Sequence, residues 1–303
     1  MRQSFITLGK KIYDVRKSRE ARRMLVFVAR CYLNRGRLEA LDDYFHQTPL
    51  LAEIADIYPF VYEQPTRAFF YNGSTFDERA RLVEEHMAFL AERLRPEVLT
   101  DIYREEEQLL WQMDRGEAPP LRLVLFYEPG QRKEGILSVI LRLGTSSLYQ
   151  MIFWIARDHA RDGEWALWIG AMQGPNMADA REVIKRITKE CHAYRTKNLI
   201  LYATQAVARA LGIGRIYAVT NEGYYANNHL RMDRKLKTSF SDFWMEAGGW
   251  KTEDGRFDAL PLTEPRKTME EVPVRKRAVY RKRFALLDEI DNTIAENMAR
   301  LMK

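Results

Sequence analysis

Long apolar runs and grouped cysteines are both missing from this sequence of 303 residues. The longest apolar stretch, 148–156, is about half of the roughly 20 residues that a membrane-spanning helix needs. No apolar segment of the kind found in secretion signals follows the first residues. Cys31 and Cys191 lie far apart and lack metal-ligand spacing, so we expect reduced, buried thiols and no metal site. These absences predict a cytoplasmic protein without a transmembrane segment.

The signature motifs of common enzyme classes are absent as well. No GxxxxGK[ST] loop, HExxH helix or GxSxG elbow occurs. Gly212-Ile213-Gly214 follows a predicted helix and enters a predicted strand, the reverse of the order in dinucleotide-binding folds. The five histidines lack ligand spacing, and His86 lies on the apolar face of a predicted helix, where we expect a buried, hydrogen-bonded imidazole. No nucleic-acid-binding signature is present, so we do not expect such a partner.

The composition is that of a folded protein, with 46% hydrophobic and 30% charged residues. Its net charge of +6 is concentrated at the two ends. Residues 1–37 hold eleven Lys and Arg against two acidic residues, and residues 264–283 hold eight against three. Such ends suit an anionic membrane surface, with a peripheral place at the inner membrane, or a protein partner. Ordinary solvated helices are the alternative.

Apolar spacing and turn residues predict three regions: helices over 1–118, an α/β domain over 119–262 and a basic C-terminal helix over 263–303. Within the first region, helical periodicity predicts helices over 16–33, 77–94 and 96–113, with loops and a short helix over 48–73. The last region has an apolar stripe that either faces a membrane or docks on the core: Val279, Phe284, Leu286, Leu287, Ile290, Ile294 and Met298.

The middle region is predicted to begin with four strands and to continue with alternating helices and strands. Apolar runs followed by turn residues predict the strands 121–127, 135–143, 147–156 and 164–172. Their short connections favour an antiparallel meander. We then expect helices over 178–192 and 199–211, a strand over 215–220, a helix over 222–235 and a strand over 256–260. This is an α+β class with a mixed, mainly antiparallel sheet and flanking helices, in an acetyltransferase-like (GNAT-like) order.

The first candidate site segment is the turn Gln173-Gly174-Pro175-Asn176 after the fourth strand. Backbone N–H groups at a strand-to-helix turn can hold an anion such as pyrophosphate, so Gln173 and Gly174 are candidate substrate-binding residues. A plain connecting turn is the alternative. The turn lacks the [RQ]xxGx[GA] pattern of the acetyltransferase pyrophosphate loop.

The second segment places a titratable imidazole beside two cations at a helix end. His192 is a candidate acid or base, and Arg195 and Lys197 are candidate substrate-binding residues. Cations also favour a helix C-terminus because of the helix dipole, which is the structural alternative.

The third segment follows the buried strand over 215–220 and is the richest in polar groups. Sites in open α/β sheets gather at the carboxyl ends of strands, although a network of satisfied polar groups would explain the same residues. The candidate catalytic residues here are Tyr224, Tyr225, Asp242 and Glu246, and the candidate substrate-binding residues are Asn221, Asn228, His229 and Trp244.

Taken together, these segments resemble the VirK/YbjX family of bacterial proteins over about residues 17–290. The matching stretches are Arg19-Glu20-Ala21-Arg22-Arg23, 81–94, Glu134-Gly135-Ile136-Leu137, 168–174, 192–197, 221–229, 242–249, 260–262 and 275–283. The usual family motif reads like HGLRPK, whereas this chain has His192-Ala193-Tyr194-Arg195-Thr196-Lys197, without the Gly and Pro. The resemblance implies links to virulence, antimicrobial-peptide resistance and envelope maintenance. It implies no established activity and no catalytic residue.

Two functions of different classes follow as hypotheses. The first is an acyl- or aminoacyl-type transferase that takes acyl-CoA, acyl-carrier protein or another acyl donor. Tyr224 or Tyr225 would be its acid, and the base would be one of Glu222, Glu246, Asp242 and His192. This hypothesis requires Gln173, His192, Asn221, Tyr225 and Glu246 to meet around one cleft. The second is a non-catalytic envelope-maintenance or antimicrobial-peptide-resistance factor that binds an anionic membrane or a protein.

Overall fold

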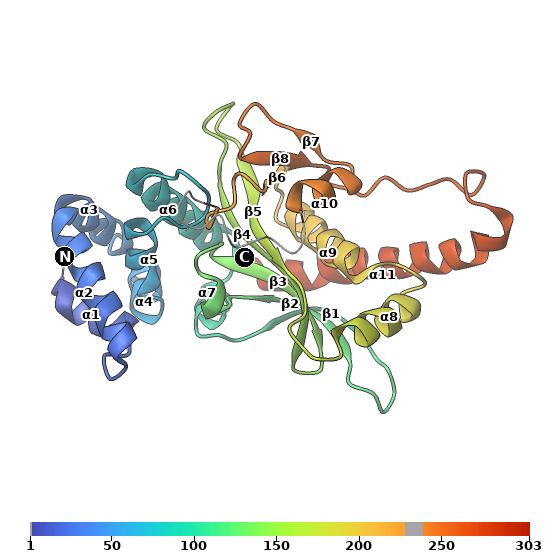
Figure 1. The fold of residues 1–303 in the computed structure, drawn as a ribbon, viewed down its shortest axis with the longest axis horizontal. Helices are drawn as coiled ribbons and strands as arrows, with labels where there is room; N and C mark the ends of the chain where they lie inside the picture. The colour runs from blue at the N-terminus through green and yellow to red at the C-terminus, as the bar shows by residue number, and fades with distance from the viewer. Residues whose placement is uncertain (1, 228–238) are drawn as a thin grey trace.

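The computed structural model describes residues 2–227 and 239–303. Its α+β fold is built on one eight-stranded sheet in the order β1-β2-β3-β4-β5-β6-β8-β7 (Figure 1). The strands are β1 Gln108–Met113, β2 Leu121–Phe126, β3 Leu137–Leu143, β4 Ser146–Arg157, β5 Trp165–Gln173, β6 Ile216–Val219, β7 Trp250–Lys251 and β8 Phe257–Leu260. Neighbours are antiparallel except β5 and β6, the one parallel pair in the described sheet. The mixed, mainly antiparallel sheet that we predicted is therefore confirmed.

Helices flank the sheet on both sides. Those before it are α1 Phe5–Ile12, α2 Ser18–Leu33, α3 Arg35–Phe45, α4 Pro49–Ile57, α5 Phe60–Glu63, α6 Phe76–Arg93 and α7 Pro96–Tyr103, with the 3-10 turn η1 Gln64–Thr66 after α5. The later ones are α8 Ala180–Glu190, α9 Thr196–Ala210, α10 Phe240–Glu246 and α11 Arg277–Leu301. A capping box between Thr75 and Glu78 fixes the start of α6.

Three predictions of secondary structure are wrong. The helix over 96–113 ends at Tyr103, because Leu110 and Trp111 are buried in β1, which pairs with β2. The stretch 48–73, predicted as loops with one short helix, contains the two helices α4 and α5. The helix over 222–235 does not begin as predicted, because Tyr224 forms an antiparallel bridge with Tyr71. Its later part lies outside the described residues.

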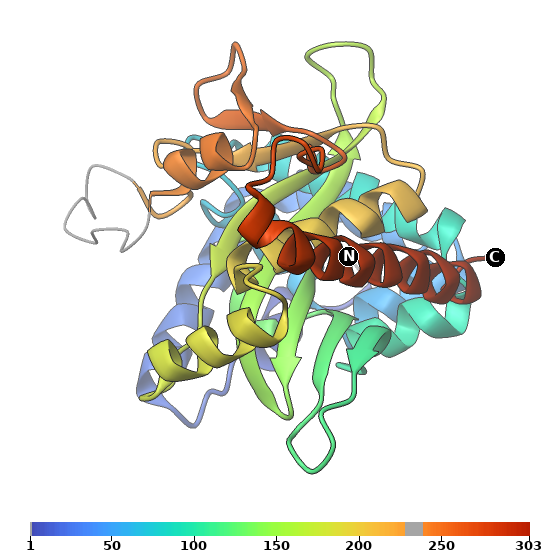
Figure 2. The same cartoon turned by 90° about the vertical axis from the view of Figure 1, so that its right-hand side faces the viewer.

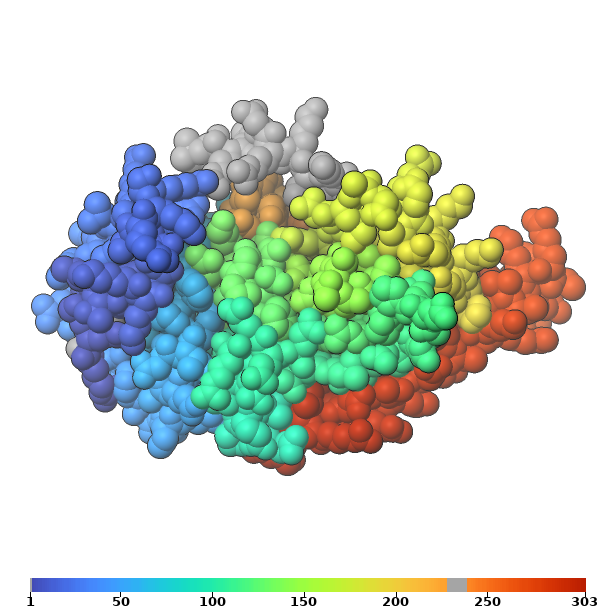
Figure 3. Space-filling model, turned by 90° about the horizontal axis from the view of Figure 1, so that it is seen from below, coloured from blue at the N-terminus to red at the C-terminus, as the bar shows by residue number. Residues whose placement is uncertain are grey.

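The C-terminal helix docks on the core. α11 begins at Arg277, later than the predicted boundary at 263, and runs across the molecule beside α9 and β1 (Figure 2). Its apolar stripe is buried from Leu286 to Met298, whereas Val279 near its start is exposed. The end of the chain pairs with the end of α6, since the N–H of Lys303 donates to the carbonyl of Arg93 at 3.0 Å. Seen from below, the red C-terminal segment lies along the segment that holds β1 (Figure 3).

The buried histidine and thiols agree with the sequence. His86 is fully buried, its Nδ1 accepts from the N–H of Ile155 at 3.0 Å, and its Nε2 lies 3.1 Å from the hydroxyl of Tyr103. Burial lowers the pKa of His86 to about 3, so the ring is neutral. Cys31 and Cys191 are buried and free. None of the described helices is long and apolar enough to cross a membrane.

Candidate functional site

Three loops meet near the end of the sheet at which β5 and β6 finish. The segment after η1 lies between the β2–β3 loop and the turn after β6. On one side the N–H of Phe70 donates to the carbonyl of Lys133 at 2.8 Å. On the other side the N–H of Asn72 donates to the carbonyl of Gly223, also at 2.8 Å. Side chains far apart in sequence are thereby brought together at the carboxyl ends of the parallel strand pair.

Glu134 is the carboxylate at the centre of these loops, and it is only 5% exposed. The hydroxyl of Tyr224 donates to its Oε1 at 2.6 Å, and the amide of Gln173 donates to its Oε2 at 2.7 Å. Gln173 also exchanges hydrogen bonds of 2.5 and 2.6 Å with the amide of Gln131. We call these four residues the Glu134 cluster. Since Tyr224, Gln173 and Gln131 are half-buried, the cluster lies at the border between core and solvent.

The electrostatics of the Glu134 cluster raise the proton affinity of Glu134 and keep Tyr224 protonated. Burial raises the pKa of Glu134, and this effect outweighs the hydrogen bonds from Tyr224 and Gln173 and the charge of Lys133, which lower it. Burial and the neighbouring Glu134 charge also raise the pKa of Tyr224. A carboxyl whose pKa moves toward neutrality, bonded to a phenol, can accept a proton and pass it on.

Two glycines allow this close approach of loops. A Cβ atom at Gly170, in β5, would overlap the carbonyl of Glu134. A Cβ atom at Gly223 would likewise overlap the carbonyl of Arg256. Glycine is therefore required where the β2–β3 loop lies on β5 and where the turn after β6 lies on the segment before β8.

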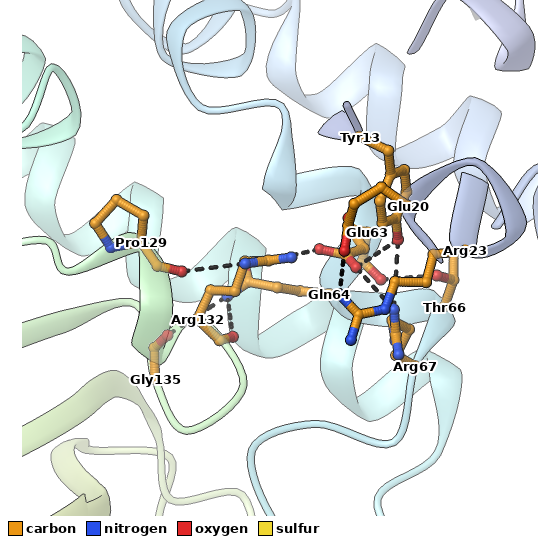
Figure 4. Close-up of polar contacts among 10 residues, drawn as sticks. All are labelled: Tyr13, Glu20, Arg23, Glu63, Gln64, Thr66, Arg67, Pro129, Arg132 and Gly135. Carbon is orange, nitrogen blue, oxygen red and sulfur yellow. Dashed lines mark hydrogen bonds and ion pairs between the residues drawn. The ribbon is translucent and has the colours of Figure 1, made fainter. Parts of the chain in front are cut away.

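A second network holds the β2–β3 loop from behind. Glu63 is fully buried and accepts from Nε of Arg132 at 2.7 Å, Nη1 of Arg67 at 3.1 Å and the hydroxyl of Tyr13 at 2.5 Å. Figure 4 shows Arg132 reaching Glu63 from the β2–β3 loop, while Tyr13 and Arg67 approach from the helical side. Burial lowers the pKa of Arg132, but the charge of Glu63 and its hydrogen bond, together with Tyr127 and Tyr58, raise that pKa above its ordinary value. Since Glu134 follows two residues after Arg132, this network fixes the position of the Glu134 cluster.

Several predicted site residues lie in or beside the Glu134 cluster. Gln173 and Tyr224 belong to it. The ring of Tyr225 meets that of Tyr224 edge-on at 5.0 Å. Gly174 lies against the ring of Tyr149. Asn221 has a local structural role, because its Oδ1 accepts from the N–H at the start of α10 at 2.7 Å.

Other predicted residues form a separate group between α9 and α10. Nζ of Lys197 lies 3.0 Å from the carboxylate of Glu246, and Arg195 reaches the same group at 3.7 Å. This carboxylate is exposed and borders a hollow of about 210 Å³. Asp242 is exposed in the first turn of α10, whereas Trp244 is a core residue whose Nε1 donates to the carbonyl of Val219 at 2.8 Å.

His192 lies in a third place, at the turn between α8 and α9. It has a φ of 52° and Ala193 a φ of 61°, so two successive non-glycine residues are left-handed. Arg283 from α11 donates to both of their carbonyls, at 3.2 and 3.1 Å. In the described chain no hydrogen bond or ion pair joins His192 or Glu246 to the Glu134 cluster. Asn228 and His229 lie outside the described residues.

Sequence reasoning missed Glu134, Gln131 and Glu63. A signal for the first was present, because a charged residue followed by glycine stands between two apolar strands in the matching stretch Glu134-Gly135-Ile136-Leu137. Glu63 gave no signal, since it lies in a stretch that we predicted as loops and a short helix.

Comparison with known proteins places the chain in a family. The family model described as "Protein of unknown function (DUF535)" matches residues 16–296. The chain belongs to this DUF535 family. It is 31% identical over 135 residues to the protein YbjX of Escherichia coli, a match that covers 44% of this chain and 41% of that protein. The resemblance to the VirK/YbjX family is thus confirmed.

Two other relatives match more of the chain. An uncharacterized protein of Haemophilus influenzae is 27% identical over 298 residues, which cover 96% of this chain and 94% of that protein. A Mannheimia haemolytica protein with the name "Membrane protein LapB" is 23% identical over 208 residues, or 67% of this chain and 82% of its own. No solved structure matches.

Proposed function

We propose that this DUF535 protein is an acyl- or aminoacyl-type transferase that works at the Glu134 cluster. The observation that carries the proposal is the buried carboxyl of Glu134, bonded to the hydroxyl of Tyr224 at the carboxyl ends of the parallel pair β5 and β6. An acyl-CoA, an acyl-carrier protein or another acyl donor would supply the transferred group.

The topology gives this proposal a second support. From β2 onward the strand order is β2-β3-β4-β5-β6-β8-β7, and one parallel pair interrupts an antiparallel sheet. Helices α8 and α9 connect the two parallel strands. This is the order expected of an acetyltransferase-like fold, in which the acyl donor lies where the parallel strands end. The support is an analogy, because one fold hosts many functions.

The proposed chemistry uses Glu134 as base and Tyr224 as acid. The carboxylate takes the proton of the attacking amine or hydroxyl, whose nitrogen or oxygen forms a bond to the carbonyl carbon of a thioester. The carbon–sulfur bond breaks, and Tyr224 gives its proton to the departing thiolate. Tyr224 then regains a proton from Glu134 across their hydrogen bond. No proton is gained or lost, and a base whose pKa approaches the working pH is the more effective one.

Calorimetry and a thiol-release assay test this proposal. We expect acetyl-CoA or an acylated carrier protein to bind the full-length chain with measurable heat. Glu134→Gln should slow thiol release by about 10²- to 10⁴-fold, the usual contribution of a positioned acid or base. The exposed Glu117→Gln, in the loop between β1 and β2, is the matched control and should leave the rate unchanged. No heat from either donor at saturating concentration would contradict the proposal.

A second candidate is the non-catalytic factor that binds an anionic membrane. It is favoured by the solvent-facing side of α2, where Leu25 is 69% and Leu33 84% exposed beside several arginines. Apolar side chains next to cations suit a lipid surface. Co-sedimentation with vesicles should depend on anionic lipid, and equal pelleting with neutral vesicles would exclude attachment by charge.

A further inference from the structure

An arginine-lined hollow lies between α2 and the segment after α5, away from the groups that carry the proposed chemistry. It has a volume of about 470 Å³ and is lined by five arginines, namely Arg19, Arg22, Arg23, Arg30 and Arg67. Four of the five come from α2, and their spacing of three, four and seven residues puts them on neighbouring rows of one helix side. We call this feature the arginine hollow.

Most of the positive charge in the arginine hollow is not neutralised. Arg23 pairs with Glu20, and Arg67 pairs with Glu63 at 3.1 Å. The other three arginines form no ion pair or side-chain hydrogen bond with any part of the chain that the structure describes. Like charges around one concavity repel each other, and an anion between them removes that repulsion.

The effect of this charge reaches neighbouring cations. The pKa of Lys133 is lowered, first by burial and then by the charges of Arg132, Arg67 and Arg23. Burial lowers the pKa of Arg79 to about 10, and the charge of Arg30 acts in the same direction. Because five arginines line one concavity and three of them have no counter-charge in the described chain, the arginine hollow is a place of positive potential.

The wall and floor of the hollow are held in place before any ligand binds. Phe27 and Tyr13 are buried beneath it. The hydroxyl of Tyr13 accepts from Nη1 of Arg67 at 3.4 Å, and the buried carboxylate of Glu63 fixes the same guanidinium (Figure 4). The guanidinium of Arg67 also lies over the ring of Phe69, 5.2 Å from its centroid. A guanidinium group that is held in place in this way binds an anion at a lower entropic cost than a freely moving side chain does.

We propose that the arginine hollow binds a ligand that carries two or more clustered phosphate charges. Guanidinium groups donate two parallel hydrogen bonds to phosphate oxygens, and several of them around one space match a diphosphate or a phosphomonoester better than a single carboxylate. This site is separate from the proposed transferase chemistry, because none of its arginines belongs to the Glu134 cluster, although Arg67 is paired with Glu63 of the network that holds the β2–β3 loop. The phosphate can come from a free compound or from a lipid headgroup, and the two sources are distinguished by experiment.

Calorimetry of the full-length protein with sodium pyrophosphate at low ionic strength is the first arm. We expect binding that weakens about ten-fold or more in the double variant Arg19→Gln/Arg22→Gln and in Arg30→Gln, because each loses charge-assisted hydrogen bonds. The matched control is Arg35→Gln/Arg104→Gln, which removes the same charge from two exposed positions outside the hollow. The control should bind within about two-fold of the natural chain.

Vesicle binding is the second arm. Vesicles with phosphatidic acid, which carries a phosphomonoester, are compared with phosphatidylglycerol vesicles of equal charge. Preference for phosphatidic acid that disappears in Arg19→Gln/Arg22→Gln, without pyrophosphate binding, assigns a lipid headgroup. Pyrophosphate binding without vesicle preference assigns a free phosphate compound. If neither probe binds, or if the control double variant loses as much binding as the hollow variants, the site is not a phosphate site.

Discussion

The hydroxyl of Tyr224 and the carboxylate of Glu134 lie 2.6 Å apart, although 90 residues separate them in the chain. The first residue belongs to the turn after β6 and the second to the β2–β3 loop. Each group therefore depends on the other for its burial and its hydrogen bonding. A substitution at either position will change the environment of the other residue.

Tyr224→Phe should raise the pKa of Glu134 further, because the hydrogen bond that it removes lowers that pKa. At neutral pH the carboxylate also loses a charge-assisted bond, so the free energy of unfolding should fall by about 1.5–3 kcal/mol. Urea unfolding and NMR titration of the Glu134 carboxyl measure the two effects. Tyr44→Phe, whose hydroxyl donates to the carbonyl of Glu84 at 2.7 Å, is the control. An unchanged Glu134 titration would show that the bond is not formed.

The buried His86 should make the protein sensitive to acid. Its pKa is about 3 in the folded protein and about 6.5 in the unfolded chain, so between these values the unfolded chain binds the additional proton. The stability that neutral His86 contributes is complete above pH 6.5 and is lost as the pH falls toward 3, at up to about 1.4 kcal/mol per pH unit.

The variant His86→Asn isolates this effect. It does not titrate, so its free energy of unfolding should vary less between pH 6.5 and pH 4, even though the smaller side chain lowers stability at every pH. The exposed His159→Asn should keep the full dependence of the natural protein. If the free energy of unfolding falls with pH equally in the natural chain and in His86→Asn, the buried His86 is not the source of the acid sensitivity.

Glu63→Gln should be among the most destabilising single substitutions. The change leaves Arg67 and Arg132 without their shared buried counter-charge, and the loss of one partner from a buried ion pair costs about 3–5 kcal/mol. Chemical denaturation measures it. Glu53→Gln breaks the exposed pair with Arg104 and should cost about 1 kcal/mol or less. Equal effects of the two substitutions would mean that the buried network does not hold the loop.

Ala193→Gly should stabilise the chain. At a φ of 61° an alanine is strained by roughly 1 kcal/mol, and glycine adopts this conformation without that strain. Glycine also gives the unfolded chain more conformational entropy, which offsets part of this relief of strain. We therefore expect the free energy of unfolding to rise by about 0.5 kcal/mol, seen as a higher melting temperature. Ala29→Gly, in the exposed middle of α2, should instead destabilise. A lower melting temperature for Ala193→Gly would contradict the strained turn.

The strands of the meander could be predicted because their apolar runs end at clear turn residues. β1 could not, since its six residues show no alternation that separates a strand from a helix, and only pairing with β2 decides between them. The helices α4 and α5 were hidden by proline and aromatic residues, although Thr48 and Pro49 form a good helix start.

The candidate site was predicted only in part. Gln173 and Tyr224 were found because both follow predicted strands. Their partner Glu134 was missed, because the sequence does not say which loop reaches the ends of β5 and β6. His192 and Glu246 carried suitable chemistry, but α8, α9 and α10 place them elsewhere. The catalytic and binding roles of these residues stay predictions.

The docked C-terminal helix limits how this molecule can respond to a membrane. The five side chains that α11 buries are Leu286, Leu287, Ile290, Ile294 and Met298. Exposing them together would cost about 8–15 kcal/mol, which is comparable to the whole stability of a domain. Detaching this helix would thus amount to unfolding. A lipid or protein that binds this helix must therefore do so at its basic start, before Leu286, or along its exposed side, while the buried stripe stays in the core.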